Sequence, residues 1–218
     1  MKPLSFYLTA LLSAALLSGC SLLEHSSPSA SAASTRVQGL LQATDDGNWQ
    51  LSQCWGQPTL TLSNSDLQAI SQGAPEEIIR SGSFFDSSGR IEQQQFIPST
   101  LHRLQAEGHD CTDPKFKQLF FRAYGNEPGW MITLEKNGLL FEQFNQPAVA
   151  IPFIETTLPS GAISISSSDP QINFQLLLTP AQCIDSMSGT TSAWQAKLQF
   201  AQPQQQLQGC AYPGLQRR

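Results

Sequence analysis

The amino-acid sequence predicts an all-β protein in two parts: a small N-terminal OB-like barrel, followed by a second antiparallel β-barrel or sandwich. Two observations support this prediction. The chain contains 15 glycines and 14 prolines, which separate it into short segments. Within many of these segments apolar and polar residues alternate, as they do in strands with one buried face.

The first 20 residues have the pattern of an export signal. Lys2 precedes an uncharged apolar stretch, which is shorter than the roughly 20 residues that a membrane-spanning helix needs. The stretch ends in Leu17-Ser18-Gly19-Cys20, which resembles the lipobox of bacterial lipoproteins. This resemblance implies a signal peptide over residues 1–19 and lipidation of the Cys20 thiol. The alternative is an ordinary secreted protein with a cysteine near its cleavage site.

Lipidation of Cys20 would make the lipid bilayer one partner of the protein. Three acyl chains exceed the two membrane signals that stable anchoring requires. The next residue is Ser21 and not Asp, which by the same resemblance implies an outer-membrane protein that faces the periplasm. Residues 20–35 are predicted to form a flexible tether, because residues 26–35 are rich in Ser and Ala. No second membrane segment is predicted.

The composition argues against a nucleic-acid partner. Only 13% of the residues are charged and the formal net charge is −5. Proteins that bind nucleic acids instead concentrate Lys and Arg on one face. The sequence contains no such cluster.

Five cysteines become an even number once Cys20 is assigned to the lipid. In an oxidising compartment the remaining four predict two disulfides, for which three pairings are possible. We favour Cys54–Cys111 with Cys183–Cys210, because the chain divides between these pairs. A zinc site is the alternative, but the sequence has neither CxxC nor HxxxH spacing. We therefore predict no metal and no cofactor.

Residues 36–112 are predicted to form the OB-like barrel. Val37, Gly39 and Leu41 fall on one face of a first expected strand, and two further strands are expected around residues 49–54 and 60–62. A short helix over residues 65–70 would be capped by Asn64 or Ser65. A hairpin follows, with strands over residues 78–85 and 91–104, a turn at residues 87–89 and a bend at Pro98. Three strands, a helix and two strands give the order of an OB-like barrel.

Residues 113–218 are predicted to form the second β domain, after a turn at residues 111–114. Lys136-Asn137-Gly138 is a hairpin turn of the Asn-Gly type. About eight short strands are enough for a small barrel or a sandwich. The expected strands cover residues 119–124, 130–134, 139–144, 149–154, 163–166, 172–178, 194–200 and 206–210.

Two motifs carry a family resemblance over about the last hundred residues. Residues 123–130 read AYGNEPGW and resemble the GNEPFW signature of a family of envelope lipoproteins. Residues 183–189 read CIDSMSG, and residues 209–211 read GCA, which resembles the ending of the same family. This family is distantly similar to the META-type and NlpE lipoproteins. Gly129 stands where the signature has Phe, so Trp130 is the only aromatic residue left in it.

Residues 125–130 are predicted to form a tight, rigid turn. Gly125 and Asn126 can adopt a positive φ, and Glu127 precedes a proline and should be extended. On a functional interpretation Asn126 and Glu127 make polar contacts and Trp130 serves as a platform. On a structural interpretation the turn is a corner whose polar side chains bond their own backbone.

The other polar clusters in the sequence predict structural loops and not catalytic or metal sites. Asp185, Ser186 and Ser188 lack a GxSxG context, and the available histidines are His25, His102 and His109. We therefore predict a structural loop and no enzymatic activity. The spacing of His102, His109 and Asp110 fits no metal site, and a solvated loop is expected instead.

The sequence as a whole predicts a lipid-anchored periplasmic protein with a non-catalytic binding or envelope-interaction role. Its ligand would be an envelope protein or a small molecule. One alternative is an inhibitor of an envelope-directed hydrolase. Another is an envelope stress or metal-related lipoprotein, as the NlpE resemblance implies, although the missing CxxC argues against it.

Overall fold

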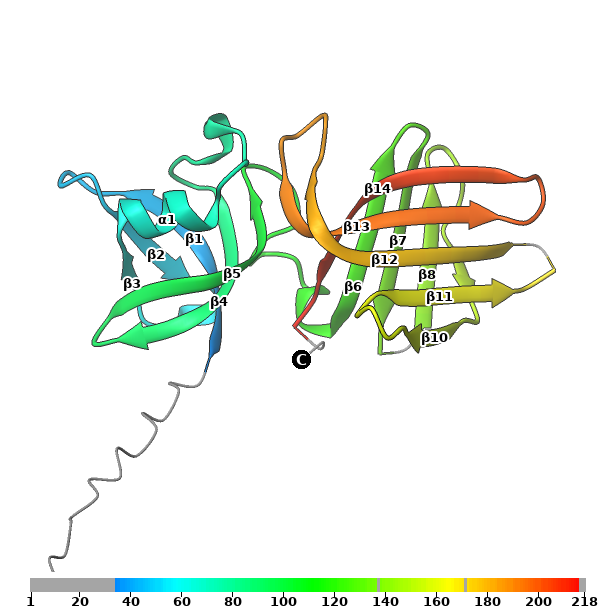
Figure 1. Cartoon of the computed structure of the whole chain (residues 1–218), viewed down its shortest axis with the longest axis horizontal. Coiled ribbons are helices and arrows are strands. Elements are labelled where there is room, and N and C mark those ends of the chain that lie inside the picture. Colours follow the sequence, from blue (N-terminus) through cyan, green and yellow to red (C-terminus); the bar gives the residue numbers. More distant parts are fainter. Residues whose placement is uncertain (1–33, 137, 171, 216–218) are drawn as a thin grey trace, which may run out of the picture. The chain divides into compact units, whose positions relative to one another are not determined.

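Figure 1 shows a computed structural model of the chain, which describes residues 34–136, 138–170 and 172–215. The predicted signal peptide, Cys20 and all but the end of the predicted tether lie outside these residues, as does Asn137 of the predicted hairpin turn. The described residues belong to one compact unit. No helix among them is long and apolar enough to cross a membrane.

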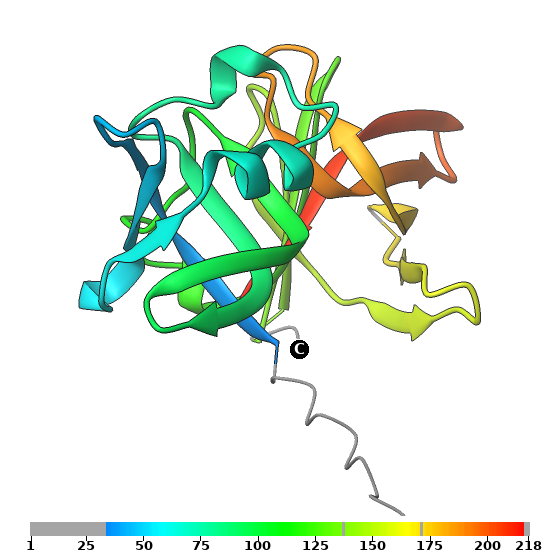
Figure 2. The same cartoon turned by 60° about the vertical axis from the view of Figure 1, so that its left-hand side comes forward.

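The N-terminal strands form a closed five-stranded barrel, and the predicted order of three strands, a helix and two strands is confirmed. The elements are β1 (Thr35–Ala43), β2 (Trp49–Gln53), β3 (Leu60–Leu62), α1 (Asn64–Ile70), β4 (Phe84–Glu92) and β5 (Gln95–Gln105). They pair in the order β3-β2-β1-β4-β5. Parallel pairing of Thr61 with Gln95 joins β3 to β5 and closes the barrel. Figure 2 shows α1 lying against these strands, where it adds Leu67 to their apolar core.

The helix cap lies earlier than predicted. Ser63, and not Asn64 or Ser65, is the N-cap residue: it is extended, and its hydroxyl accepts a hydrogen bond from the Asp66 amide at 3.0 Å. This bond satisfies one of the free amide groups of the first turn. Asn64 is instead the first helical residue, and its side-chain oxygen accepts a hydrogen bond from the Trp49 indole.

The hairpin turn predicted at residues 87–89 was wrong. These residues lie inside β4, and the turn is at residues 93–94, where Gln93 has a φ of +55°. The Ser87 hydroxyl donates to the Thr100 carbonyl across the strand pair, so it serves the sheet and not a turn. Gly89 allows close strand approach, because a Cβ there would lie 2.2 Å from the Ile97 carbonyl oxygen. The first strand of the hairpin also begins at Phe84 and not at residue 78.

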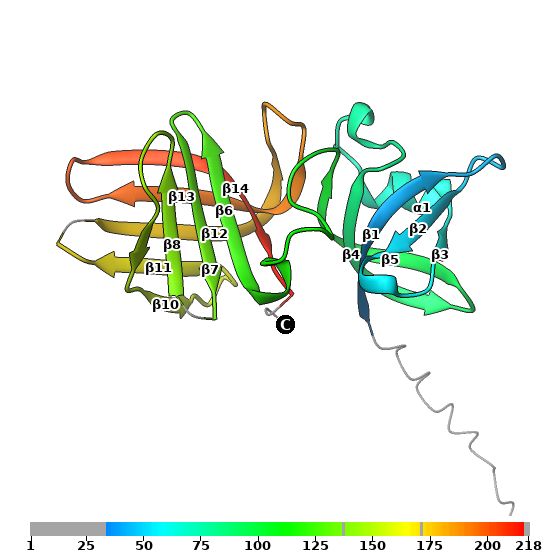
Figure 3. The same cartoon turned by 180° about the vertical axis from the view of Figure 1, so that it is seen from behind.

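The second half of the chain forms an antiparallel meander that returns on itself. Each strand pairs with the next from β6 to β9 and from β10 to β14, and β14 pairs with β6. Figure 3 shows β6, β7 and β8 side by side. The strands are β6 (Leu119–Asn126), β7 (Gly129–Glu135), β8 (Gly138–Gln143), β9 (Val149–Ile151), β10 (Ile154–Thr157), β11 (Ile163–Ser168), β12 (Asn173–Ile184), β13 (Thr191–Phe200) and β14 (Gln205–Pro213).

The meander is interrupted between β9 and β10, which do not pair with each other. The sequence had predicted one strand over residues 149–154. Pro152 lies between the two strands, and proline cannot donate a backbone hydrogen bond to a sheet. The strand predicted over residues 172–178 instead continues to Ile184, with an irregularity between Pro180 and Cys183.

The two predicted halves share contacts. Thr191 and Ser192 at the start of β13 pair with β5. A small buried cluster also draws on both halves, with Phe84 on one side and Tyr212 on the other. The boundary predicted at residue 112 falls between β5 and β6, in a segment that packs Phe116 into this cluster.

Both favoured disulfides are present in the structure, Cys54–Cys111 and Cys183–Cys210. The first spans 57 residues and the second spans 27. In the chain-entropy model each loop contributes about 3–4 kcal/mol to the free energy of unfolding.

Candidate functional site

The two sequence motifs meet through a side-chain hydrogen bond. The Asn126 amide, at the end of β6, donates to Asp185 Oδ2 over 2.7 Å. The strands that carry the motifs approach closely here, because a Cβ on Gly209 would lie 1.8 Å from the Tyr124 carbonyl oxygen. Gly209 therefore allows the backbones of β6 and β14 to pack closely.

The Asp185 carboxylate organises the loop that follows β12. Its Oδ1 accepts from the Met187 amide at 3.1 Å, and from the amide and hydroxyl of Ser188 at 2.7 and 2.8 Å. Burial by itself would raise the pKa of Asp185, but the hydrogen bonds from Ser188 and Asn126 outweigh it and lower that pKa. This bonding pattern is the structural loop that the sequence predicts.

Trp130 lies in the core and is not an exposed platform, as the functional interpretation of the turn would require. Its side chain is only 3% exposed and packs in the apolar cluster inside the meander. The prediction of positive φ at Gly125 and Asn126 was wrong: both belong to β6, and neither has a positive φ. Gly125 is needed for space, because a Cβ there would lie 2.4 Å from Trp130 Nε1 and from the Gln208 carbonyl oxygen. Glu127 is exposed.

The structure does not bring the three predicted recognition residues together as one surface. Asn126 is bonded to Asp185, and Trp130 is buried. Glu127 borders a polar hollow beside the Cys183–Cys210 disulfide. Asn126 and Trp130, but not Glu127, line a second hollow, which we call the Tyr124 cleft.

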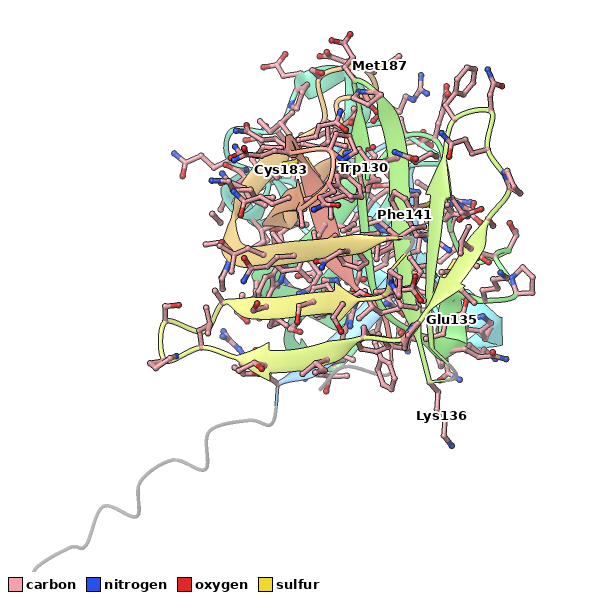
Figure 4. The ribbon with its side chains drawn as sticks, turned by 90° about the vertical axis from the view of Figure 1, so that its right-hand side faces the viewer. Trp130, Glu135, Lys136, Phe141, Cys183 and Met187 are labelled. Carbon is pink, nitrogen blue, oxygen red and sulfur yellow. A yellow bond between two sulfur atoms is a disulfide. The ribbon has the colours of Figure 1, made fainter. Side chains whose placement is uncertain are left out.

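The Tyr124 cleft has a volume of about 390 Å³ and lies along β6, β7 and β8. The loop after β5 and the loop before β13 form its other walls. Its main lining side chains are Arg122, Tyr124, Trp130, Met131, Glu142 and Phe144. Phe144 is 77% exposed, which is unusual for a phenylalanine, and Met187 in the Asp185 loop is equally exposed. Figure 4 shows Met187 and Trp130 toward one end of the strands and Glu135 and Lys136 at the other.

Arg122 is the buried cation of the cleft, with only 3% of the residue exposed. Its Nη1 donates to Tyr212 Oη at 3.1 Å and to Asp113 Oδ2 at 3.2 Å. Burial disfavours the charged guanidinium, but Tyr212 and Asp113 more than offset this cost and raise the pKa of Arg122. The buried Nε of Arg122 has no hydrogen-bond partner among the described residues.

Two further groups set the charge around Arg122. His109 Nδ1 lies 3.1 Å from the same Asp113 oxygen. Burial, together with the nearby Arg122, lowers the pKa of His109. The fully buried Arg103 guanidinium lies 3.9 Å above the centre of the Tyr212 ring, and its three nitrogens have no hydrogen-bond partner in the described part of the chain. Asp113 is therefore shared by Arg122 and His109.

The prediction that His102, His109 and Asp110 lie in a solvated loop is only partly right. His102 lies in β5, half-buried, and its Nε2 is 2.7 Å from the Ser88 hydroxyl. Asp110 accepts from the amide and hydroxyl of Thr112, as a loop residue should. Across residues 34–136, 138–170 and 172–215, no group of three or more His, Cys, Asp or Glu side chains could hold a metal ion.

Sequence reasoning missed Arg122, Tyr124 and Tyr212. A signal was present in β6, where Arg122, Tyr124 and Asn126 alternate with the core residues Phe121 and Ala123. An arginine and a tyrosine on one strand face indicate a polar-aromatic surface. The sequence does not show that the loop after β5 covers this surface.

The hydrogen bond between the motifs can be tested by a double-mutant cycle. We expect Asn126→Ala to lower the free energy of unfolding by about 1 kcal/mol, and Asp185→Asn by about 1–3 kcal/mol, because the latter also loosens the loop. The double variant should lose less than the sum, with a coupling of about 0.5 kcal/mol or more. Urea unfolding at pH 7 measures all three; strictly additive losses would contradict the pairing.

The pH must be neutral in this experiment. The folded pKa of Asp185 lies below its ordinary value of 3.8. Its contribution to stability is therefore complete above that value and is lost as the pH falls through the folded pKa.

Comparisons with protein families, curated proteins and solved structures found no match to this chain. The family resemblance of residues 123–130 and 183–211 therefore stays a prediction.

Proposed function

We propose that the chain is a lipoprotein of the bacterial outer membrane, anchored through acylated Cys20, and that its periplasmic β domain binds a partner molecule at the Tyr124 cleft. Binding would occur without chemical conversion of the ligand. The observation that carries the proposal is the cleft itself, which combines an exposed apolar rim with a buried arginine.

The form of the cleft supports binding. Ligand sites are typically concave and mostly apolar, with a few well-placed polar groups. Here Met131 and Phe144 are apolar lining groups, and Arg122, Tyr124 and Glu142 are among the polar ones. Three of the walls are strands, so the site is built on a rigid scaffold. The two disulfides add to this rigidity, since each closes a long loop.

The bonding of the reactive side chains supports a non-catalytic role. A general base must be free to take a proton from a bound molecule. Both oxygens of the Asp185 carboxylate are occupied by hydrogen bonds within the protein. The residue placed best for contact is therefore Arg122, which binds anions and carbonyl oxygens and does not transfer protons at neutral pH.

Site-specific photo-cross-linking in living cells tests the proposed site. A benzoyl-phenylalanine at position 144 of the full chain should give a discrete adduct, because this side chain stands at the cleft rim. The matched control is position 91, where the native isoleucine is also exposed. Adding Met131→Glu should remove the adduct at 144, since it places a charge in the cleft wall. Equal adducts at 144 and 91, or survival of the adduct in Met131→Glu, would refute this site.

A further inference from the structure

We infer that the Tyr124 cleft recognises an apolar monocarboxylate, whose carboxylate pairs with the Nε and Nη2 edge of Arg122. This inference rests on the proposed binding function and adds the chemical class of the ligand. It starts from two arginines in the same chain that use their guanidinium groups differently.

Arg36 shows what this edge of a guanidinium does when a carboxylate is present. Its Nε and Nη2 donate to the two oxygens of Asp86, at 2.8 and 2.6 Å. Such bidentate pairs are among the stronger hydrogen-bonded contacts in proteins. Arg122 uses only Nη1 for its protein contacts, and its Nε is buried without a partner among the described residues. The edge that Arg36 fills with Asp86 therefore lacks an acceptor in Arg122.

Arg122 has one carboxylate partner among the described residues, Asp113. Burial lowers the pKa of Arg103, and Tyr212 and Asp86, which also pairs with Arg36, oppose this effect. Asp113 is the carboxylate that contacts Arg122, while the guanidinium of Arg103 is buried nearby over Tyr212. His109 adds no charge at neutral pH, because its pKa is lowered. Arg122 thus shares Asp113 with His109, and the Nε of Arg122 keeps no acceptor among the described residues.

The cleft walls select for an apolar body and a single negative charge. Met131 and Phe144 line it, and Met187 lies in the adjacent loop; Met131 and Met187 are the only methionines after Met1. Methionine side chains adapt to apolar ligands of different shapes. Glu107 and Glu142 line the same cleft, and their repulsion increases with each negative charge on the ligand. A monocarboxylate is therefore favoured over a phosphate dianion.

The size of the cleft limits the ligand to one small group. At about 390 Å³ it lies near the lower end of ligand pockets, which span roughly 300–1,000 Å³. A free apolar acid and the last residue of a peptide with a free C-terminus present the same chemistry. The experiment is arranged to separate these two sources.

Calorimetry on the full chain in lipid nanodiscs, with empty nanodiscs as the blank, tests the inference. The probes are 3-phenylpropionate and N-acetylphenylalanine, each compared with its own neutral amide. Both acids should bind about tenfold or more tightly than their amides, because a hydrogen bond to a charged group is worth about 1.5–3 kcal/mol. The acid that binds with the higher affinity shows whether the site favours a free apolar acid or the C-terminus of a peptide. Amides that bind as tightly as the acids, or acids that do not bind at millimolar concentration, would overturn the inference.

Arg122→Lys provides the matched variant, because it keeps the charge and removes the bidentate edge. It should lower the affinity for the acids about tenfold and that for the amides much less, because only the acids make the bidentate, charged contact. If its melting curve shows that it does not fold, Glu142→Gln decides: the acids should bind several-fold more tightly, and unchanged acid affinity would overturn the inference.

The failure of this inference can be told apart from failure of the proposed function. If acids and amides bind equally and Phe144→Ala weakens both, the cleft binds ligands without using the Arg122 edge. The carboxylate inference then fails, and the proposed binding function stands. If photo-cross-linking at position 144 fails as well, the proposed function fails with it.

Discussion

Cys20→Ala is expected to abolish labelling of the protein by radioactive palmitate and to release it from the membrane fraction. The expected effect is complete, because the thiol is the atom that would carry the diacylglycerol, and no other membrane-spanning segment is predicted. Each buried methylene of an acyl chain contributes about 0.8 kcal/mol to membrane binding, so loss of all the chains removes the anchor. Palmitate labelling and membrane fractionation in a bacterial host measure both results.

Ser21→Asp is the matched control for this experiment. The lipobox resemblance implies that it keeps the label and the membrane association but moves the protein to the inner membrane. If Cys20→Ala remained labelled and membrane-bound, the lipoprotein prediction would be wrong. A labelled Ser21→Asp variant that stays in the outer membrane would contradict only the sorting prediction.

Trp130→Ala should lower the free energy of unfolding by about 3–5 kcal/mol. The indole is 3% exposed and packs within the core of the meander, where its loss leaves a cavity that the strands cannot collapse to fill. For a chain of this size the melting temperature should fall by roughly 6–20 °C. Thermal and urea unfolding of the purified protein measure the loss.

Glu127→Gln is the matched control, because Glu127 lies two residues before β7, the strand that contains Trp130. Its carboxylate is exposed, so the free energy of unfolding should change by less than about 0.5 kcal/mol. Normal stability in Trp130→Ala would refute the core position of the indole. A large loss in Glu127→Gln would instead point to a structural role for the carboxylate that its exposure does not suggest.

The sequence predicted features that depend on local patterns. The order of the N-terminal strands follows from alternation and turn residues, and the pairing of Cys54 with Cys111 follows from where the chain divides. The turn at residues 87–89 was mispredicted for a related reason. Ser-Ser-Gly is typical of turns, but here tertiary pairing with Thr100 and the Ile97 carbonyl places these residues inside β4.

The candidate site depended on contacts between distant segments. The Asn126–Asp185 bond joins residues 59 positions apart, although each had been singled out within its own motif. The role of Arg122 could not be predicted, because its partners Asp113 and Tyr212 come from a loop and from the last strand. Periodicity assigns a residue to a face, but it does not show which segment covers that face.

The first strand has a mechanical consequence for an anchored protein. β1 begins at Thr35, so a pull transmitted from a lipidated Cys20 would enter the domain there. One residue later, Arg36 donates hydrogen bonds to Asp86 on β4 and to the carbonyl oxygens of Pro213 and Gly214 near the C-terminus. Tension would therefore be shared between β1, β4 and the C-terminal segment, and β1 would not separate from the sheet by itself. The disulfides close loops that begin at Cys54 and Cys183, so the resistance of β1 would depend on noncovalent contacts.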